Sequence, residues 1–240
     1  MVASRAVAQA RRQSSSAKTP APRARRTRKA APVEPRVRIL DSAEALFAER
    51  GYYGASMRDI AKAADVVPSH VVYAFGTKEE LFVATLARRI DELVQARAQR
   101  LEEVESAKKP GLEAILRSYI APLLERSENG GEGWRKYGQL IAQVANQRKT
   151  FELESMNSVF DKLDKGGHGL IVSIRRAVPG LGQRDAIVGF LFFASAMLTI
   201  FAETGRIERL TANKCHSHDL DALCVVLVPF CSGGFRALAK

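Results

Sequence analysis

The sequence has no acidic residue at its start, few cysteines, and no hydrophobic run of the about 20 residues that a bilayer span needs. Before Glu34 there are nine Lys or Arg residues and no Asp or Glu, so this segment carries most of the formal net charge of +11. It also contains almost no large apolar side chains. Because such a segment buries too little surface to offset the entropy lost on ordering, residues 1–33 are predicted to be a disordered basic tail.

The three cysteines all lie near the C-terminus, at positions 215, 224 and 231. An odd, clustered set argues against a disulfide scaffold and predicts a reducing, cytoplasmic environment. The N-terminal segment lacks the apolar run of a secretory signal. Cys224 and Cys231 are spaced to share one helix face and are predicted to be small core residues.

The longest apolar stretch, Ala186–Ala202, is bounded by Asp185 and Glu203 and holds seventeen uncharged residues. A bilayer span needs about 20 such residues. The stretch is therefore predicted to be a buried helix, and no membrane partner is expected.

Catalytic motifs are also missing. No HExxH, GxSxG or glycine-rich phosphate loop occurs, and no segment shows a convincing strand pattern. We therefore predict an all-α chain that is not an enzyme and needs no cofactor. The run Cys215–Asp219 contains potential metal ligands, but its spacing matches no zinc motif. It is predicted to be a polar loop without metal. The alternatives are one metal ion held with a further donor from elsewhere in the chain, and an enzyme that uses the cysteine and histidines of the loop.

The most informative segment that is present is a helical pattern over Arg36–Glu80. Gly51 is placed to end a first helix, whose apolar stripe is Val37, Leu40, Ala43, Leu46 and Phe47. Ser56 and Thr77 each precede an acidic residue by three positions, as in a capping box, and predict the starts of two further helices. Pro68 suits the first turn of another helix between them. Three short helices in this order are typical of a helix-turn-helix unit.

Three consecutive blocks carry a family resemblance: ALFAERGY (Ala45–Tyr52), MRDIA (Met57–Ala61) and FGTKEEL (Phe75–Leu81). In this order they resemble the DNA-binding domain of TetR-family transcriptional regulators. The resemblance implies an all-helical, dimeric repressor with a DNA-binding domain at residues 34–80. A ligand-binding and dimerisation domain would follow at residues 81–240, sharing a helix at about 78–106.

By this resemblance, the helix at about 68–75 enters the major groove of a pseudo-palindromic DNA operator. The predicted DNA contacts are Ser56, Arg58, Ser69, His70, Val72, Tyr73 and Lys78. Ser and His can hydrogen-bond base edges, Val can contact a thymine methyl, and Lys can hold a phosphate. Val67, Val72 and Ala74 depart from residues common in the family, so the operator sequence does not transfer from a relative.

Beside such a domain, the basic tail is predicted to act as an electrostatic arm on DNA phosphates, and Arg23–Lys29 could enter a minor groove. A solubilising extension and a misplaced start codon are the alternatives. A transit peptide has a similar composition, but the helix-turn-helix unit disfavours it.

Further helices are predicted at about 112–126, from Trp134, and at about 150–165, 170–178, 184–204 and 219–238. The glycine-rich run at 166–169 is expected to interrupt one of them. A mostly apolar effector cavity is expected among these helices. About a third of the following candidates are predicted to line it: Tyr119, Trp134, Tyr137, Ile141, Phe160, His168, Phe190, Phe193, Met197 and Phe201.

The helices at 184–204 and 219–238 are apolar nearly all round, so each must be covered on two sides. By resemblance they form an intersubunit four-helix bundle, with Gly189 and Ala196 allowing close approach. From Ala177 onward the chain is similar to a family subset that includes regulators of fatty-acid catabolism.

The leading prediction is a homodimeric repressor released from its operator by a small hydrophobic or aromatic effector. The alternative is a helix-turn-helix regulator without an effector, acting as an activator or architectural DNA binder.

Overall fold

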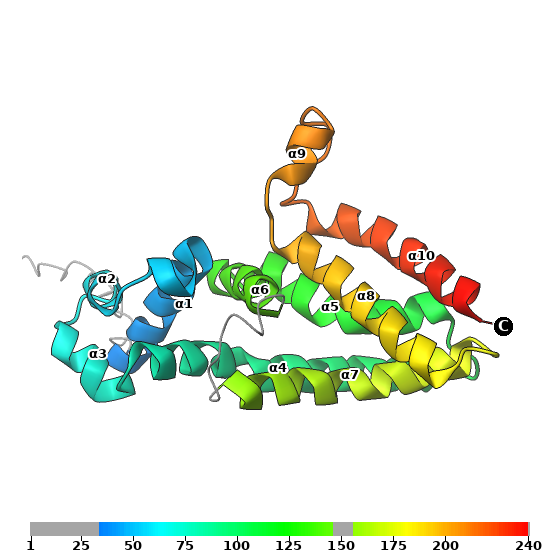
Figure 1. Ribbon diagram of the computed structural model, residues 1–240, viewed down its shortest axis with the longest axis horizontal. Helices are drawn as coiled ribbons and strands as arrows, with labels where there is room; N and C mark the ends of the chain where they lie inside the picture. The colour runs from blue at the N-terminus through cyan, green and yellow to red at the C-terminus, as the bar shows by residue number, and fades with distance from the viewer. Residues whose placement is uncertain (1–33, 146–155, 240) are drawn as a thin grey trace, which may run out of the picture. The chain divides into compact units, whose positions relative to one another are not determined.

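The computed structural model describes residues 34–145 and 156–239, and Figure 1 shows their arrangement. Within these ranges every regular element is a helix, which confirms the all-α prediction. The predicted basic tail and the start of the helix expected at 150 lie outside the described residues. The helices are α1 Pro35–Gly54, α2 Met57–Ala63, α3 Pro68–Phe75, α4 Lys78–Glu105, α5 Leu112–Asn129, α6 Glu132–Ala145, α7 Asn157–Ala177, α8 Gln183–Phe201, α9 Arg206–Leu210 and α10 Leu220–Leu238.

Helix α1 forms the centre of the N-terminal unit. Its apolar side packs against α2 and α4, where the Phe47 ring meets the Phe82 ring edge-on at a centroid distance of 4.9 Å. Gly51 has φ +69° and kinks the helix, and one short turn follows before α1 ends. The predicted role of this glycine as a helix stop is therefore correct for the main part of α1, because a positive φ suits glycine.

Helix α4 connects the N-terminal unit to the rest of the molecule. It starts beside α3, packs against α1, and then runs alongside α5 and α7 (Figure 1). Its apolar face is fully buried, through Leu81, Phe82, Leu86, Ile90 and Leu93. Helix α4 therefore packs against both the N-terminal unit and the helices that follow it.

Helix α7 differs from the sequence prediction. The run Gly166–Gly169 does not interrupt it, because α7 is continuous from Asn157 to Ala177. The glycines instead face neighbouring helices at close range. A Cβ on Gly167 would lie 2.5 Å from the Phe190 ring of α8, and one on Gly166 would lie 3.3 Å from Val94 of α4. Close helix packing explains the glycines that sequence reasoning took as a break.

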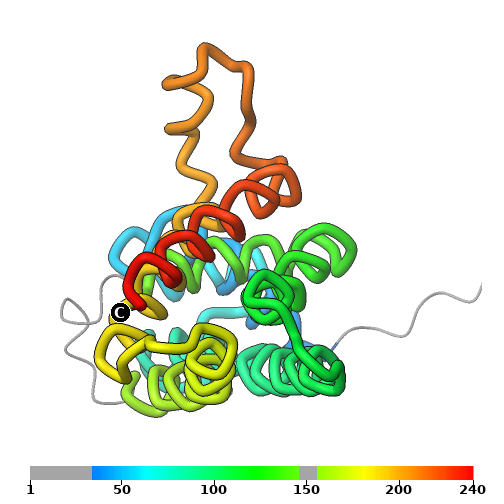
Figure 2. The backbone as a smooth tube through the Cα atoms, turned by 90° about the vertical axis from the view of Figure 1, so that its right-hand side faces the viewer, coloured from blue at the N-terminus to red at the C-terminus, as the bar shows by residue number. Residues whose placement is uncertain are grey.

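Helices α8 and α10 pack side by side, as both views show (Figure 2). A Cβ on Gly189 would lie 2.5 Å from the ring of Phe235. The close approach at Gly189 is therefore made within the chain, to α10, and not to a second subunit. Cys224 of α10 is buried, as predicted, and burial raises the pKa of its thiol to about 11.

The outer sides of α8 and α10 are apolar and exposed. The exposed large side chains there are Ile187, Val188, Leu191, Phe192, Val225, Val226, Phe230 and Leu238. By length and composition alone, both helices could cross a membrane, and 33% and 39% of their apolar windows are buried. Helix α9 and its flanking loops project away from this pair in both views.

Candidate DNA-binding surface and effector cavity

The turn between α2 and α3 is built by local hydrogen bonds. Ser56 caps α2, since its hydroxyl oxygen accepts from the backbone N–H of Asp59 at 3.1 Å. The hydroxyl also donates to the Asp59 carboxylate, which lowers the pKa of that group. After α2, Asp65 adopts φ +53° and the N–H of Val66 bonds back to Ala61. This turn holds α3 at a fixed angle to α2.

Helix α3 has one buried and one exposed face, as the sequence predicted. Val71 and Phe75 are 0% and 8% exposed, whereas Tyr73 is 92% exposed. The other predicted outward residues, Ser69, His70 and Val72, are also exposed. These four side chains therefore point away from the core, and they can contact another molecule without disturbing the packing.

The end of α3 is fastened to α1 and α4. Arg36 lies over the Phe75 ring at 4.2 Å and donates to the carbonyl of Ala74 at 2.9 Å. Thr77 and Glu80 form the predicted capping box, with bonds of 3.1 and 2.7 Å. These contacts set the orientation of α3 relative to the long α4 helix.

Lys78 lies in the first turn of α4, and its ammonium is 4.6 Å from the centre of the Tyr52 ring. Burial lowers the pKa of this amine. No carboxylate among the described residues pairs with it. With Ser56 and Arg58, both exposed at the start of α2, it gives the surface around α3 polar and cationic groups suited to phosphates.

A cavity of about 200 Å³ lies among the five helices α4, α5, α6, α7 and α8. Its walls are Arg97 of α4, Tyr119 of α5, Ile141 and Ala145 of α6, Phe160, Leu163 and Asp164 of α7, and Phe190, Leu191, Ala194, Ser195, Met197 and Leu198 of α8. Most of these side chains are apolar, as expected for a small-molecule site. A second cavity of about 300 Å³ lies between α4, α5 and α7 and shares Arg97 and Tyr119 with the first.

Half of the ten predicted effector contacts line the first cavity. They are Tyr119, Ile141, Phe160, Phe190 and Met197. Trp134, Tyr137 and Phe201 are buried elsewhere in the core, and Phe193 lines another cavity, of about 480 Å³, between α8 and α10. His168 is exposed on α7 and lines none of these cavities. Sequence periodicity located the buried face of each helix but not the gaps between helices.

Arg97 is one of the cavity residues that sequence reasoning missed. Its side chain is only 5% exposed, its Nε donates to the Tyr119 carbonyl at 3.0 Å, and its guanidinium lies 3.8 Å from the centre of the Tyr119 ring. Within the described part of the chain, no carboxylate pairs with it. The signal was available, because Arg97 continues the apolar spacing of Ile90 and Leu93 on the buried face of α4.

A buried ion pair occupies the junction between α1, α4 and α6. Arg89 binds the Glu44 carboxylate through Nε at 2.8 Å and Nη2 at 3.0 Å. The Glu44 side chain is 1% exposed, and burial raises its pKa, although Arg89 opposes the shift. The guanidinium also lies 4.8 Å from the Trp134 ring centre. A Cβ on Gly133 would lie 2.6 Å from Arg89, so this glycine is needed for close packing.

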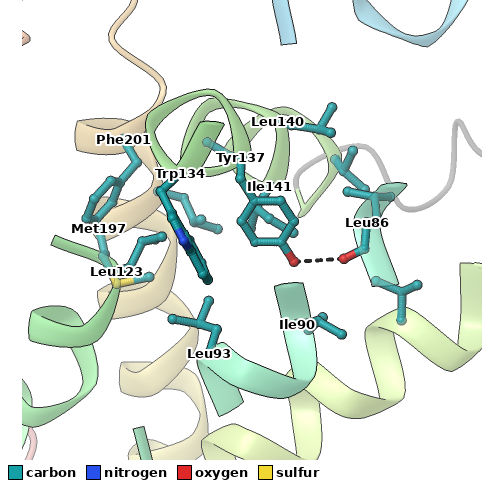
Figure 3. Close-up of a cluster of buried hydrophobic side chains, with 14 of the residues drawn as sticks. Leu86, Ile90, Leu93, Leu123, Trp134, Tyr137, Leu140, Ile141, Met197 and Phe201 are labelled. Atoms are coloured by element: carbon teal, nitrogen blue, oxygen red, sulfur yellow. Dashed lines mark hydrogen bonds between the residues drawn. The ribbon is translucent and has the colours of Figure 1, made fainter. Parts of the chain in front are cut away.

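Helix α6 is further bonded to both neighbouring units. Tyr137 donates its hydroxyl to the carbonyl of Leu86 in α4 at 2.8 Å (Figure 3), and burial raises the pKa of that hydroxyl, so it stays a donor. Gln143 donates to the carbonyl of Ala48 in α1 at 2.7 Å. Since Ile141 of the same helix lines the cavity, α6 links the cavity wall directly to the N-terminal unit.

Two family models each match one part of the chain. Residues 39–85 match the family described as bacterial regulatory proteins, tetR family. Residues 117–234 match the family described as tetracyclin repressor-like, C-terminal domain.

Two curated relatives are each 29% identical to this chain. They are the HTH-type transcriptional activator FasR of Mycolicibacterium smegmatis, over 136 residues, and the HTH-type transcriptional repressor KstR2 of Rhodococcus jostii, over 138 residues. Each match covers 55% of this chain, and the chain spans 60% and 62% of the respective relatives.

Solved structures share the fold. A TetR-family regulator from Bordetella parapertussis aligns with a TM-score of 0.62 at 17% identity, over 85% of this chain and 97% of that one. AibR, in complex with isovaleryl coenzyme A and operator DNA, aligns with a TM-score of 0.59 at 21% identity, over 82% and 97%. FadR from Bacillus subtilis, in complex with stearoyl-CoA, aligns with 0.56 at 16% identity, over 82% and 98%.

Proposed function

Because the chain belongs to the TetR family of bacterial transcriptional regulators, we propose that it is a dimeric repressor released from its operator by a small effector. The effector has an apolar body and an anionic head group. Arg97 supports this effector class. It is a buried cation that lines the cavity and has no carboxylate partner among the described residues.

Burying a charged side chain away from water costs free energy. An arginine does not deprotonate in proteins, so burial keeps a full charge away from water. Such a charge is tolerated when it is paired and hydrogen-bonded. Arg97 has one bond to a neutral carbonyl and one aromatic ring beneath it, so an anion entering the cavity would complete its coordination. The apolar walls of α8 would receive the rest of the ligand.

The dimer is supported by the outer face of α8 and α10. Phe192 and Phe230 are 68% and 76% exposed on adjacent helices, which form an apolar surface too continuous for an isolated soluble subunit. Pairing of two such faces gives a two-fold dimer. Its two α3 helices would then enter successive major grooves about 34–36 Å apart.

Helix α4 supplies the route between effector and DNA. At about 1.5 Å per residue, Arg97 lies about 28 Å along the helix from Lys78. A ligand that favours a different α4 position shifts the population away from the DNA-binding arrangement. A coupling of about 1–3 kcal/mol gives roughly 5–150-fold relief.

The names of the relatives support both signs of regulation, since KstR2 is called a repressor and FasR an activator. An activator is therefore the second candidate. Transcription from a selected binding site, with and without the protein, separates them: repression lowers the transcript and activation raises it.

The DNA and dimer parts are tested together by selecting binding sites from random double-stranded DNA and measuring mass in solution. We expect a pseudo-palindromic site and a dimer. Phe230→Asp should abolish both, whereas Tyr73→Asp, at the equally exposed recognition surface, should abolish DNA binding but leave the dimer. A wild-type monomer, or the absence of any selected sequence, would contradict the proposal.

A further inference from the structure

The projecting arm around α9 contains a cluster of three potential metal ligands. One donor atom each from Glu208, His216 and His218 lies within 4.8 Å of the other two. The chain has four histidines, so half of them meet at this one carboxylate. The sequence had shown the potential ligands of the loop Cys215–Asp219, including the two histidines, but not Glu208. Glu208 joins them through the fold, because α9 turns its side chain back toward the loop.

One carboxylate oxygen of Glu208 accepts hydrogen bonds, and the other has no hydrogen-bond partner among the described residues. Oε1 accepts from the backbone N–H of Ser217 at 2.6 Å and from its hydroxyl at 2.7 Å. Oε2 is buried and has no hydrogen-bond partner within the described residues. A buried carboxylate oxygen without a partner is costly, so this atom is suited to accept a cation.

Ser217 fixes the orientation of this carboxylate through its two bonds to Oε1. Bonds that orient one oxygen of a ligating carboxylate are also the outer contacts that metal sites commonly use.

The two imidazoles complete a donor set on the exposed side. Their ring centres are 5.0 Å apart with an interplanar angle of 23°. Neither ring has a hydrogen bond to any group in the described ranges, so the ring nitrogens remain open to an ion. Both side chains are exposed and free to turn through the small distance that coordination requires.

The backbone that carries these ligands is fixed at both ends. The N–H of Asn213 bonds to the carbonyl of Glu208 at 2.8 Å, and the N–H of Cys215 bonds to the hydroxyl of Thr211 at 3.1 Å. Asp219 then caps α10 by accepting from the backbone N–H of Ala222 at 3.2 Å. An ordered loop needs little further ordering to bind an ion, which favours binding.

We propose that Glu208, His216 and His218 form a site for a divalent transition metal ion of the zinc type. Two imidazole nitrogens and one carboxylate oxygen select zinc, copper or nickel over magnesium and calcium, which prefer oxygen donors alone. Three protein ligands leave a fourth position for water. With metal–ligand bonds of about 2.0–2.2 Å, the donor atoms would draw together to about 3.3 Å. The ion would tie α9 to the start of α10.

The test uses the untagged full-length protein, stripped with a chelator and titrated with Zn²⁺ by calorimetry and with Co²⁺ by visible absorption. We expect one equivalent of metal and cobalt bands typical of tetrahedral coordination. His216→Ala and His218→Ala should each weaken zinc binding at least tenfold, and Glu208→Gln about tenfold. His168→Ala removes an exposed histidine elsewhere on the molecule and should change nothing.

Circular dichroism and the melting temperature of the metal-free variants show that each is folded. Wild-type protein that binds no stoichiometric zinc would overturn the proposal. So would zinc binding that survives the double variant His216→Ala/His218→Ala and is lost in Cys215→Ser. The site is independent of the regulatory function proposed above, and either can fail without the other.

Discussion

The junction around Arg89 and the cavity around Arg97 lie eight residues apart on α4, and they surround a guanidinium in opposite ways. Each guanidinium lies over an aromatic ring, at 4.8 Å and 3.8 Å from its centre. Arg89 also has the bidentate Glu44 carboxylate, whereas Arg97 has only a backbone carbonyl. The first guanidinium is paired within the chain, and the second is the one that we propose binds an anion from outside it.

The largest effect on the free energy of unfolding is expected when the ion pair between Arg89 and Glu44 is broken. Glu44→Ala leaves Arg89 beside Trp134 without its carboxylate, and should lower the free energy of unfolding by about 3 kcal/mol. Urea denaturation measures the change. Glu49→Ala, at an exposed position on the same helix, is the control and should stay within about 0.5 kcal/mol. Equal losses in the two variants would show that Arg89 and Glu44 are not a structural pair.

Lys78 extends the comparison to the other end of α4, since it too lies over a ring without a described carboxylate. Lys78→Ala should weaken binding to a selected operator about tenfold and reduce the salt slope by about one, because one phosphate contact is lost. Fluorescence anisotropy at several salt concentrations measures both. Lys214→Ala, an exposed lysine in the arm near α9, should leave the affinity and the slope unchanged. An unaltered slope in Lys78→Ala would remove this residue from the interface.

A smaller effect is expected at the open guanidinium. Arg97→Met removes a buried charge that the chain does not neutralise, so the free energy of unfolding should stay within about 1 kcal/mol of wild type, or rise. Arg89→Met is the matched variant and should lose about 3 kcal/mol by stranding Glu44. A loss in Arg97→Met as large as that in Arg89→Met would show that both arginines are structural.

The smallest effect is expected at an exposed pair. Glu113 accepts from Ser232 and Arg236 of α10, and these bonds hold its pKa at about 2, below the ordinary 4.5. Because the fold favours the ionised form of Glu113, this carboxylate stabilises the fold above about pH 4.5. The stabilisation is lost as the pH falls through about 2. Glu113→Gln should therefore cost under about 1 kcal/mol at neutral pH, with the difference vanishing only below about pH 2. A pH-independent difference would contradict this assignment.

The sequence predicted the N-terminal unit well because its signals are local. Gly51, Ser56 and Thr77 act through backbone conformation or through residues three positions away, and the buried face of α3 follows from helical spacing. The same reasoning failed at Gly166–Gly169, whose role depends on Phe190 and Val94 in other helices.

The site residues that were missed also depend on tertiary contacts. Helical spacing places Arg97 on the buried face of α4, but the sequence does not show that it lacks a carboxylate partner among the described residues. Glu208 meets His216 and His218 across a loop. The separation of cavity-lining from core aromatics, such as Phe190 from Phe201, depends on small differences in side-chain direction.

The most direct test of the account compares decanoate with decanol as ligands that release the protein from its selected operator, for wild type and Arg97→Met. The two probes share an alkyl chain and differ in head-group charge. We predict that decanoate releases wild-type protein at a concentration at least about tenfold lower than decanol, because of its charged bond to Arg97. The preference should disappear in Arg97→Met. Equal potency of the two probes on wild type, or a preference that persists in Arg97→Met, would contradict the account.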